Sequence, residues 1–407
     1  MRRKIIYMVL AVVLLAGGAT VCIIRWQVWF GNPPEQDYAV AVRPHNVVLT
    51  YGAKAAGERV VSWRCDTLLQ PSEVEIRIAA DTLRVPAVGR MVESRAGKAV
   101  YYRAVLPWMQ AGRWIYRCRS GAEYSDWYNM TVSASDTTRF LLFGDVQDLT
   151  GRASAALFDQ AFLRHPDVDF AAFAGDVIER PTDMYWQVWL RSMHGRTACY
   201  PVVSATGNHE YLKGVRKELD PRWTAVFPNP DNGPKRFQGR SFYIDFPAFR
   251  LIVIDTDGLT LFSDYTQVQT WLAAALREAG ERWRVVMMHH PVYSAGKGRD
   301  NPLIWLTFRG TLREADVVFC GHDHNYMRRG TGSDSEGRHE PVYVLTNASE
   351  KSYAPKDTVR AEVFISGQRF YEYIKVSEDS LTVETRMAVS DSTADRLTLR
   401  REGESKN

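Results

Sequence analysis

The distribution of apolar residues divides the chain into three parts. Residues 5–24 form an uncharged apolar run about long enough to cross a bilayer as a helix. Short apolar segments between Gly, Pro and polar turns then predict β-strands at 46–50, 59–65, 74–78, 99–106, 114–118 and 127–132. This second part is therefore predicted to be a small all-β sandwich.

From residue 140 the pattern changes to strands that alternate with helices. Continuous apolar runs at 169–174, 201–205, 285–288 and 317–320 indicate strands buried on both faces. Apolar residues at helical spacing lie between them, at 153–161, 185–189 and 268–276. We predict an α/β domain with a partly parallel sheet, and a second sheet built from 241–245, 251–255, 342–346, 370–376 and 381–386.

The charges around the first apolar run favour a membrane anchor. Residues 2–4 are all basic, whereas Arg25 is the one cation just after the run, and Trp26 and Trp29 suit a membrane interface. We expect residues 1–30 to remain as an uncleaved transmembrane helix, with the rest of the chain outside the cytoplasm, in the periplasm or the extracellular space. The alternative is a cleaved signal and a secreted protein.

The remaining boundaries follow from composition. Residues 31–38, with two prolines, are expected to be a stiff linker, 39–136 the β-sandwich, 137–389 the α/β domain, and 390–407 a disordered tail. In the sandwich, Trp63 and Cys65 share one strand face, and so do Tyr116 and Cys118. Cys65 and Cys118 are thus expected to face each other, either as a disulfide or as two buried thiols.

Composition and charge exclude one class of partner. The 407 residues are 45% hydrophobic and 24% charged, which is typical of a folded protein with room for two domains. The net charge of +4 is small, and basic residues are interspersed with acidic ones. No nucleic-acid partner is expected, and the oligomeric state is left open.

Polar residues occur where the buried strands stop. Gly144-Asp145-Val146-Gln147, Gly175-Asp176 and Gly207-Asn208-His209 follow three successive strands, with spacings of 31 and 32 residues from Asp145 to Asp176 and from Asp176 to Asn208. His289 follows a fourth strand, and Gly321-His322-Asp323-His324 follows a fifth. Strand ends returned to one edge by βαβ units place these side chains together.

Carboxylates, an amide oxygen and imidazoles are suitable ligands for Zn, Mn or Fe. An aspartate can bridge two such ions, and a pair of ions can activate water and neutralise charge on a phosphate. Singly, each residue also has an ordinary structural role, such as a helix cap or a turn. Together, their order predicts a phosphoester hydrolase site.

These five motifs resemble the calcineurin-like metallophosphoesterase superfamily over residues 140–386, and the preceding sandwich is similar to the fibronectin type III-like domain of its purple acid phosphatase branch. The resemblance implies a four-layer sandwich with two central mixed sheets flanked by helices. It also implies two metal ions. The ligands of the first would be Asp145, Asp176 and His324, and those of the second would be Asp176, Asn208, His289 and His322.

Two positions depart from the purple acid phosphatase pattern. Glu179 stands where that branch has its metal-binding tyrosine, so an iron-tyrosinate centre is not expected. Gln147 stands where other branches have the histidine of Asp-x-His. Its amide oxygen either ligates the first ion or remains a polar group at the rim.

His209 is the expected proton donor to the leaving group, because it follows a ligand without being needed as one and because imidazole changes charge near neutral pH. Its alternative role is to support Asn208. We expect a metal-dependent phosphomonoesterase that uses a hydroxide activated by two metal ions, acting on a small phosphate ester. The alternatives are a phosphodiesterase or nucleotide pyrophosphatase, and a non-catalytic surface binding module.

Overall fold

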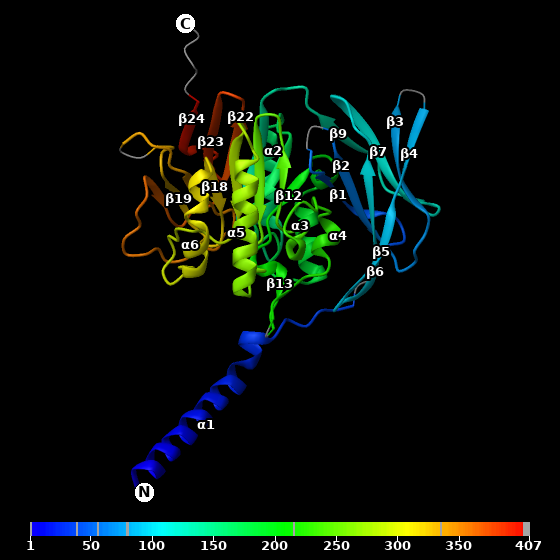
Figure 1. The fold of residues 1–407 in the computed structure, drawn as a ribbon. Helices are drawn as coiled ribbons and strands as arrows, with labels where there is room; N and C mark the ends of the chain where they lie inside the picture. The colour runs from blue at the N-terminus through cyan, green and yellow to red at the C-terminus, as the bar shows by residue number, and fades with distance from the viewer. Residues whose placement is uncertain are drawn as a thin grey trace.

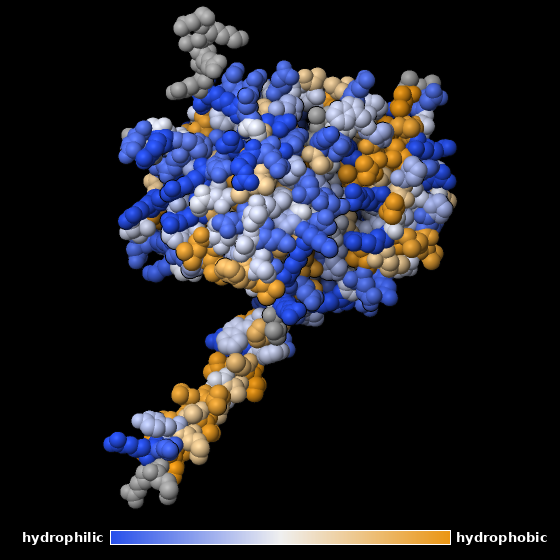
Figure 2. Space-filling view, in the orientation of Figure 1, coloured by the Kyte–Doolittle hydropathy of each residue, from blue (hydrophilic) through white to orange (hydrophobic). Residues whose placement is uncertain are grey.

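The computed structural model describes residues 2–37, 40–54, 57–78, 81–214, 216–333 and 336–401. Its first helix, α1 (Arg2–Phe30), extends away from a body in which a β-sandwich lies beside a larger α/β part (Figure 1). Within Arg3–Phe30 an 18-residue stretch has a mean hydropathy of 2.5, and the apolar side chains are exposed (Figure 2). By length and composition this helix can span a bilayer, as a membrane anchor or a signal sequence would.

The sandwich before residue 137 consists of two antiparallel sheets. One sheet has the order β1-β2-β6-β5, and the other has the order β4-β3-β7-β8 with β9 also paired to β7. The strands are β1 (His45–Tyr51), β2 (Arg59–Cys65), β3 (Ser72–Ile78), β4 (Asp81–Pro86), β5 (Val88–Ser94), β6 (Gly97–Leu106), β7 (Gly112–Ser120), β8 (Glu123–Tyr124) and β9 (Tyr128–Val132).

The two-residue period places the expected side chains inside this sandwich. Trp63, Cys65, Tyr116 and Cys118 are all buried in the core between its two sheets. Cys65 and Cys118 are present as buried thiols. Burial raises the pKa of the Cys65 thiol to about 11, so this residue is a packing group rather than a reactive thiolate.

The α/β part contains two larger mixed sheets. The six-stranded sheet has the order β12-β11-β10-β22-β23-β24, and the seven-stranded sheet has the order β15-β16-β17-β18-β20-β19-β21. A short ribbon, β13 (Tyr211–Leu212) and β14 (Glu218–Leu219), lies outside both. The other strands are β10 (Thr138–Phe143), β11 (Phe170–Phe173), β12 (Val202–Ser204), β15 (Phe242–Asp245), β16 (Phe249–Ile254), β17 (Trp283–Met288), β18 (Val317–Cys320), β19 (Tyr326–Arg329), β20 (Val342–Leu345), β21 (Val363–Ile365), β22 (Phe370–Val376), β23 (Ser380–Met387) and β24 (Thr393–Arg400).

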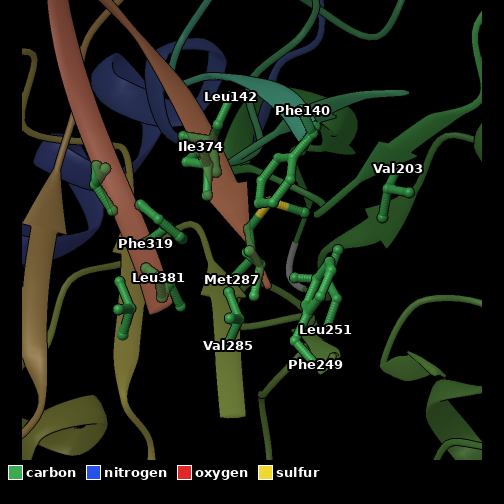
Figure 3. Packing of buried hydrophobic residues seen from close by; sticks show 14 of the residues in the cluster. Phe140, Leu142, Val203, Phe249, Leu251, Val285, Met287, Phe319, Ile374 and Leu381 are labelled. Atoms are coloured by element: carbon green, nitrogen blue, oxygen red, sulfur yellow. The ribbon is translucent and has the colours of Figure 1, made fainter. Parts of the chain in front are cut away.

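Alternate residues of each strand enter different cores. Phe140 and Leu142 of β10 pack between the two sheets with Leu251, Val285 and other apolar residues (Figure 3). Leu141 and Phe143 face the opposite way, into a core that includes side chains of α2 and α3. Because β10 is buried on both faces, its sequence is continuously apolar rather than alternating.

Helices cover the outer faces of both sheets, giving four layers. Residues of α2 and α3 share a core with the six-stranded sheet, and residues of α5 and α6 share one with the seven-stranded sheet. The fold class expected from the sequence is therefore confirmed. The helices are α2 (Arg152–Arg164), α3 (Asp183–Ser192), α4 (Trp223–Val226), α5 (Phe262–Arg277) and α6 (Pro302–Phe308), with short 3₁₀ turns η1 (Arg196–Ala198), η2 (Asn208–Glu210), η3 (Lys235–Phe237) and η4 (Thr311–Glu314).

Two expectations about the C-terminal part were wrong. The stretches 370–376 and 381–386 join the first sheet rather than the second, because β22 pairs antiparallel with β10. The expected disordered tail contains β24, which pairs with β23 along the edge of the sheet. Residues 402–407 lie outside the described residues.

Candidate metal centre

The expected ligands follow the carboxyl ends of strands from both large sheets. Asp145, Asp176 and Asn208 follow β10, β11 and β12 of the six-stranded sheet, whereas His289 and His322 follow β17 and β18 of the seven-stranded sheet. The strand ends thus meet at the rim of two packed sheets, not at the edge of one. The centre lies where the two sheets face each other.

Four residues of the site have a left-handed backbone conformation, which is unfavourable for residues other than glycine. The φ angles of Asp145, Asp176, His322 and His324 are 49°, 51°, 77° and 53°, all in the left-handed region. Each such residue costs on the order of 1–3 kcal/mol, and residues of this kind gather at functional sites. The strain turns each side chain back toward the rim immediately after its strand ends.

Two glycines permit the close approach of these loops. A Cβ on Gly207 would lie 2.1 Å from Oδ1 of Asp176, and one on Gly321 would lie 2.4 Å from Oδ2 of Asp145. The same two carboxylate oxygens accept backbone hydrogen bonds, from His209 N at 2.8 Å and from His322 N at 2.7 Å. Each aspartate is therefore fixed through one oxygen, and its other oxygen faces the rim.

One group of four donor atoms has the spacing of a metal site. Nε2 of His289 lies 3.3 Å from Oδ2 of Asp176 and 3.3 Å from Oδ1 of Asn208. Nδ1 of His322 lies 3.0 Å from the Asn208 oxygen and 3.2 Å from the His289 nitrogen. Ligand atoms about 2.1 Å from a tetrahedral ion lie about 3.4 Å from one another. The four atoms fit one ion.

A second group of donors lies beside it. Oδ1 of Asp145 is 3.4 Å from Nε2 of His324. Among the described residues, this buried oxygen has no hydrogen-bond partner. Ligand atoms of Asp145, Asp176 and His289 also lie within 4.8 Å of one another. A buried carboxylate oxygen without a donor is costly unless a cation faces it, so this group fits the first of the two expected ions, for which Asp145, Asp176 and His324 would be the ligands.

Asp176 and His289 interact as an ion pair. Burial acts to raise the pKa of Asp176, but the adjacent His289 and His209 hold that pKa well below its usual range. Burial acts to lower the pKa of His289, but the Asp176 carboxylate raises it well above its usual value. Metal binding would replace the proton of His289, because a ligating imidazole nitrogen must be deprotonated.

Gln147 directs its amide nitrogen, rather than its amide oxygen, toward Asp176. Its Nε2 donates to Oδ2 of Asp176 at 2.8 Å, and its Oε1 accepts from Nζ of Lys351 at 3.2 Å. Lys351 also pairs with Glu179, at 2.6 and 2.8 Å. The donor and acceptor partners agree on this amide orientation, which counts against direct ligation by Gln147. Glu179, in the position of the missing tyrosine, forms an ion pair with the ammonium group of Lys351.

His209 is held at the edge of the cavity. Its Nδ1 donates to the backbone carbonyl of Glu179, and its Nε2 lies 4.0 Å from Oδ2 of Asp176. The carbonyl contact fixes the proton on Nδ1, because a carbonyl only accepts. Nε2 is left as the ring nitrogen available to other partners.

Glu210 joins two of the ligand loops. Its buried carboxylate accepts backbone hydrogen bonds from Asp176 at 3.0 Å, Val177 at 2.9 Å, Ile178 at 3.2 Å and Gly207 at 2.6 Å. Glu210 fixes the loop of Asp176 against the loop of Asn208.

A cavity of about 430 Å³ opens over the ligands. Arg299 faces it, with Nη2 2.9 Å from Nε2 of His322 and donating to the backbone oxygen of His322 at 2.8 Å. His290 also borders the cavity, and its Nδ1 lies 3.0 Å from Oγ1 of Thr256. The residues bordering the cavity that lie outside the ligand motifs are Trp29, Tyr211, Leu212, Lys213, Gly214, Lys217, His290, Arg299 and Tyr353.

The fold and the site together define a domain of the metallophosphoesterase class. Residues 138–326 match the model of the calcineurin-like phosphoesterase family. The family uses a dinuclear metal centre, in agreement with the two groups of donors.

Two curated relatives come from different branches of this class. Purple acid phosphatase 21 of Arabidopsis thaliana is 24% identical over 248 residues, which cover 56% of this chain and 53% of that protein. Glycerophosphodiester phosphodiesterase GpdQ of Enterobacter lignolyticus (strain SCF1) is 26% identical over 192 residues, which cover 45% of this chain and 65% of that protein. The chain thus spans less than two thirds of the length of either relative.

The fold is also similar to solved structures. The purple acid phosphatase PPD1 from yellow lupin (Lupinus luteus) seeds aligns with a TM-score of 0.71 and 16% identity, covering 89% of this chain and 75% of that one. The structure of PhoD aligns with a TM-score of 0.62 and 11% identity, covering 90% and 92% of the two chains. These similarities extend the fold assignment beyond residues 138–326 to most of the chain.

Proposed function

We propose that this protein is a metal-dependent phosphoester hydrolase with a preference for phosphate monoesters. The observation that carries the proposal is the convergence of Asp176 Oδ2, Asn208 Oδ1, His289 Nε2 and His322 Nδ1 at spacings of 3.0 to 3.3 Å. Asp145, Asp176 and His324 hold the first ion, and Asp176, Asn208, His289 and His322 hold the second. Zn, Mn and Fe all suit this donor set.

The ions supply activation of water and neutralisation of charge on the phosphate. The side chains around the ions bind the phosphate and donate a proton to the leaving group. Arg299 and Lys217, which border the cavity, bind the phosphate oxygens. Oxygen from water forms the new bond to phosphorus, and the ester P–O bond breaks. Nε2 of His209 donates a proton to the departing alcohol oxygen.

Gln147, Lys351 and Glu179 act on the centre indirectly. The hydrogen bond from Gln147 to Asp176 fixes the shared carboxylate, and Lys351 fixes Gln147 in turn. The Lys351–Glu179 pair neutralises the carboxylate of the residue whose backbone oxygen fixes His209. This arrangement replaces the tyrosine of the purple acid phosphatase pattern.

A phosphodiesterase is the second candidate, because one relative is a glycerophosphodiester phosphodiesterase. Hydrolysis of p-nitrophenyl phosphate and of bis(p-nitrophenyl) phosphate by the purified full chain, with Zn²⁺ or Mn²⁺, distinguishes the two. The monoester should react faster. The reverse order would favour the diesterase, and binding of metal without turnover of either ester would favour a non-catalytic binding module.

Replacement of one ligand tests the site itself. Asn208→Ala should lower kcat/KM by at least about a hundredfold and reduce the metal content measured by elemental analysis. Asn129→Ala, at an exposed position of β9, is the matched control and should change neither quantity. Full activity of Asn208→Ala would overturn the proposed ligand set.

We also propose that α1 remains attached as a membrane anchor, with the body outside the cytoplasm. The basic residues 2–4 and the exposed apolar surface of α1 support this topology. Protease treatment of intact cells compared with permeabilised cells tests it. Digestion of the body in intact cells, with the protein retained in the membrane fraction, is the expected result.

A further inference from the structure

The carboxyl end of α1 lies at the mouth of the catalytic cavity. Trp29, in the last turn of the helix, borders the same cavity as Asn208 and His209. Nζ of Lys213 donates to the backbone oxygen of Val28 at 3.1 Å. In Figure 1 the helix leaves the body beside β13, the strand that directly follows the Asn208–Glu210 turn. The proposed membrane anchor and the metal centre are therefore neighbours.

The linker after α1 is bound to the body. Nδ2 of Asn32 donates to the backbone oxygen of Lys213 at 2.8 Å, and the backbone N–H of Lys213 donates to Oδ1 of Asn32 at 2.8 Å. This reciprocal pair imitates a backbone pairing and fixes Asn32 in one orientation. The sequence predicted a stiff spacer, but not that the spacer attaches to the loop beside the metal ligands.

The buried carboxylate of Glu35 attaches the linker to the body at a second point. The side chain of Glu35 is only 2% exposed and pairs with Arg222, whose side chain is equally buried. Glu35 also accepts a hydrogen bond from the backbone N–H of Asp183 at 2.5 Å, and Arg95 donates to the backbone oxygen of Pro33 at 2.6 Å. A linker held by buried ion pairs does not swing freely, so the body keeps a set orientation relative to the helix.

The surface around the cavity has the chemistry of a membrane interface. Lys213, Lys217 and Arg299 border the cavity, and Trp26 and Trp29 are exposed at the end of α1. Exposed tryptophans lie at the level of lipid headgroups, and clustered cations bind anionic lipids.

Apolar side chains extend this surface away from the helix. Phe262 is 87% exposed at the start of α5, and Leu261, Leu303 and Leu306 are exposed at the starts of α5 and α6. Figure 2 shows apolar surface along the lower edge of the body, toward α1, over the region of α6 and the lower end of α5 in Figure 1. Exposed apolar groups beside a membrane helix suit insertion into the headgroup layer.

We propose that the substrate is a phosphate monoester carried by a membrane lipid, presented to the cavity from the bilayer that α1 spans. This inference rests on the proposed phosphoesterase function. A cavity of about 430 Å³ holds a phosphorylated headgroup but not acyl chains, which stay in the bilayer. Water attacks phosphorus, the P–O bond to the lipid breaks, the lipid oxygen takes the proton from His209, and inorganic phosphate leaves.

The test uses the full chain in phosphatidylcholine nanodiscs with three probes: dioleoyl phosphatidic acid in the disc, soluble glycerol 3-phosphate, and p-nitrophenyl phosphate. We expect kcat/KM for the lipid to exceed that for glycerol 3-phosphate by at least tenfold. A thirty-residue Gly-Ser insertion after Phe30, about 30 Å in average span, separates the helix from the bound linker. It should lower lipid turnover at least fivefold and leave p-nitrophenyl phosphate turnover unchanged.

The outcomes separate the two proposals. Turnover of p-nitrophenyl phosphate with no preference for the lipid overturns the lipid substrate and leaves the hydrolase in place. Unchanged lipid turnover after the insertion also overturns the lipid proposal. Turnover of none of the three probes by the metal-loaded protein overturns the hydrolase and the lipid substrate together. Turnover of the lipid alone supports both.

A measurement independent of catalysis locates the body on the membrane. Cysteine replaces Phe262 at the start of α5, or Leu163 at the far end of α2, where the side chain is 84% exposed. Both variants carry Cys22→Ser and a fluorescent label. Brominated lipids in the disc should quench the label at position 262 and not at position 163. Equal quenching at both positions overturns the proposed orientation.

Discussion

Asn208 Oδ1 and His322 Nδ1 face each other across 3.0 Å although 114 positions separate them in the chain. Asn208 follows a strand of the six-stranded sheet, and His322 follows a strand of the seven-stranded sheet. The contact exists only when the two sheets are packed together. The metal centre is thus a property of the assembled four-layer fold, not of either sheet alone.

Removal of metal should abolish turnover and lower thermal stability. A ligand present at a hundred times its Kd stabilises the folded state by about 2.7 kcal/mol, so treatment with EDTA should lower Tm by several degrees. Addition of Zn²⁺ or Mn²⁺ should restore both Tm and turnover. In Asn208→Ala the Tm difference should be smaller. Activity that persists in protein shown to be metal-free would contradict the proposed chemistry.

His209→Gln should slow hydrolysis most for substrates whose leaving group must take up a proton. We expect kcat for an alkyl phosphate to fall by about 10²- to 10⁴-fold, because the departing alkoxide is a strong base. The loss for p-nitrophenyl phosphate should be much smaller, since that leaving group is stable as an anion. Metal content should not change. His194→Gln, at a half-exposed position, is the control. Equal losses for both substrates would indicate that His209 supports Asn208 instead.

Glu210→Ala should destabilise the fold and loosen the metal site. The change leaves four backbone N–H groups without their acceptor. A buried unpaired donor costs about 1–3 kcal/mol, so the free energy of unfolding should fall by at least about 3 kcal/mol. Denaturant unfolding measures this loss, and metal titration should show weaker binding. Glu278→Ala, at an exposed position after α5, should leave both unchanged.

Glu372→Gln should stabilise the protein as pH rises. Burial raises the pKa of Glu372 to about 8 from its ordinary value of 4.5. Between these values the unfolded chain is ionised and the folded chain is protonated, so folding stability falls by about 1.4 kcal/mol per pH unit. Glutamine does not ionise and escapes this loss.

The Tm advantage of Glu372→Gln over the natural protein should therefore be small near pH 5 and should grow toward pH 8. Glu378→Gln changes an exposed glutamate just after the same strand, β22, and should show no such trend. A constant difference at every pH would mean that Glu372 is ionised in the folded protein throughout this range.

The positions of the ligands were accessible from the sequence because each follows a continuously apolar strand. Such a strand ends at the rim of a sheet, so Asp145, Asp176, Asn208 and His289 are expected there before any coordinates are known. The division of strands between two sheets was not accessible in this way. The stretch 370–376 is apolar like its neighbours, and only its antiparallel pairing with β10 decides its sheet.

Other features of the structure cannot be predicted from the sequence around them. Lys351 reaches Gln147 from 204 positions away, and no motif surrounds it. Trp29 is an interfacial aromatic by sequence, and its place at the cavity follows only from the way Asn32 and Glu35 bind the body. The last strand, β24, is a polar edge strand whose exposed residues resemble those of a tail.

The division of the ligands between two sheets has a mechanical consequence. Ions held jointly by Asp176 and His289 would cross-link the layers at one end, while the aromatic core around Phe140 joins them along their length. Without the ions, the layers would be joined at that end only by direct contacts such as the Asp176–His289 pair. Hydrogen exchange in the metal-free protein should therefore quicken first at the ends of β11 and β17, while the middle of each strand stays protected.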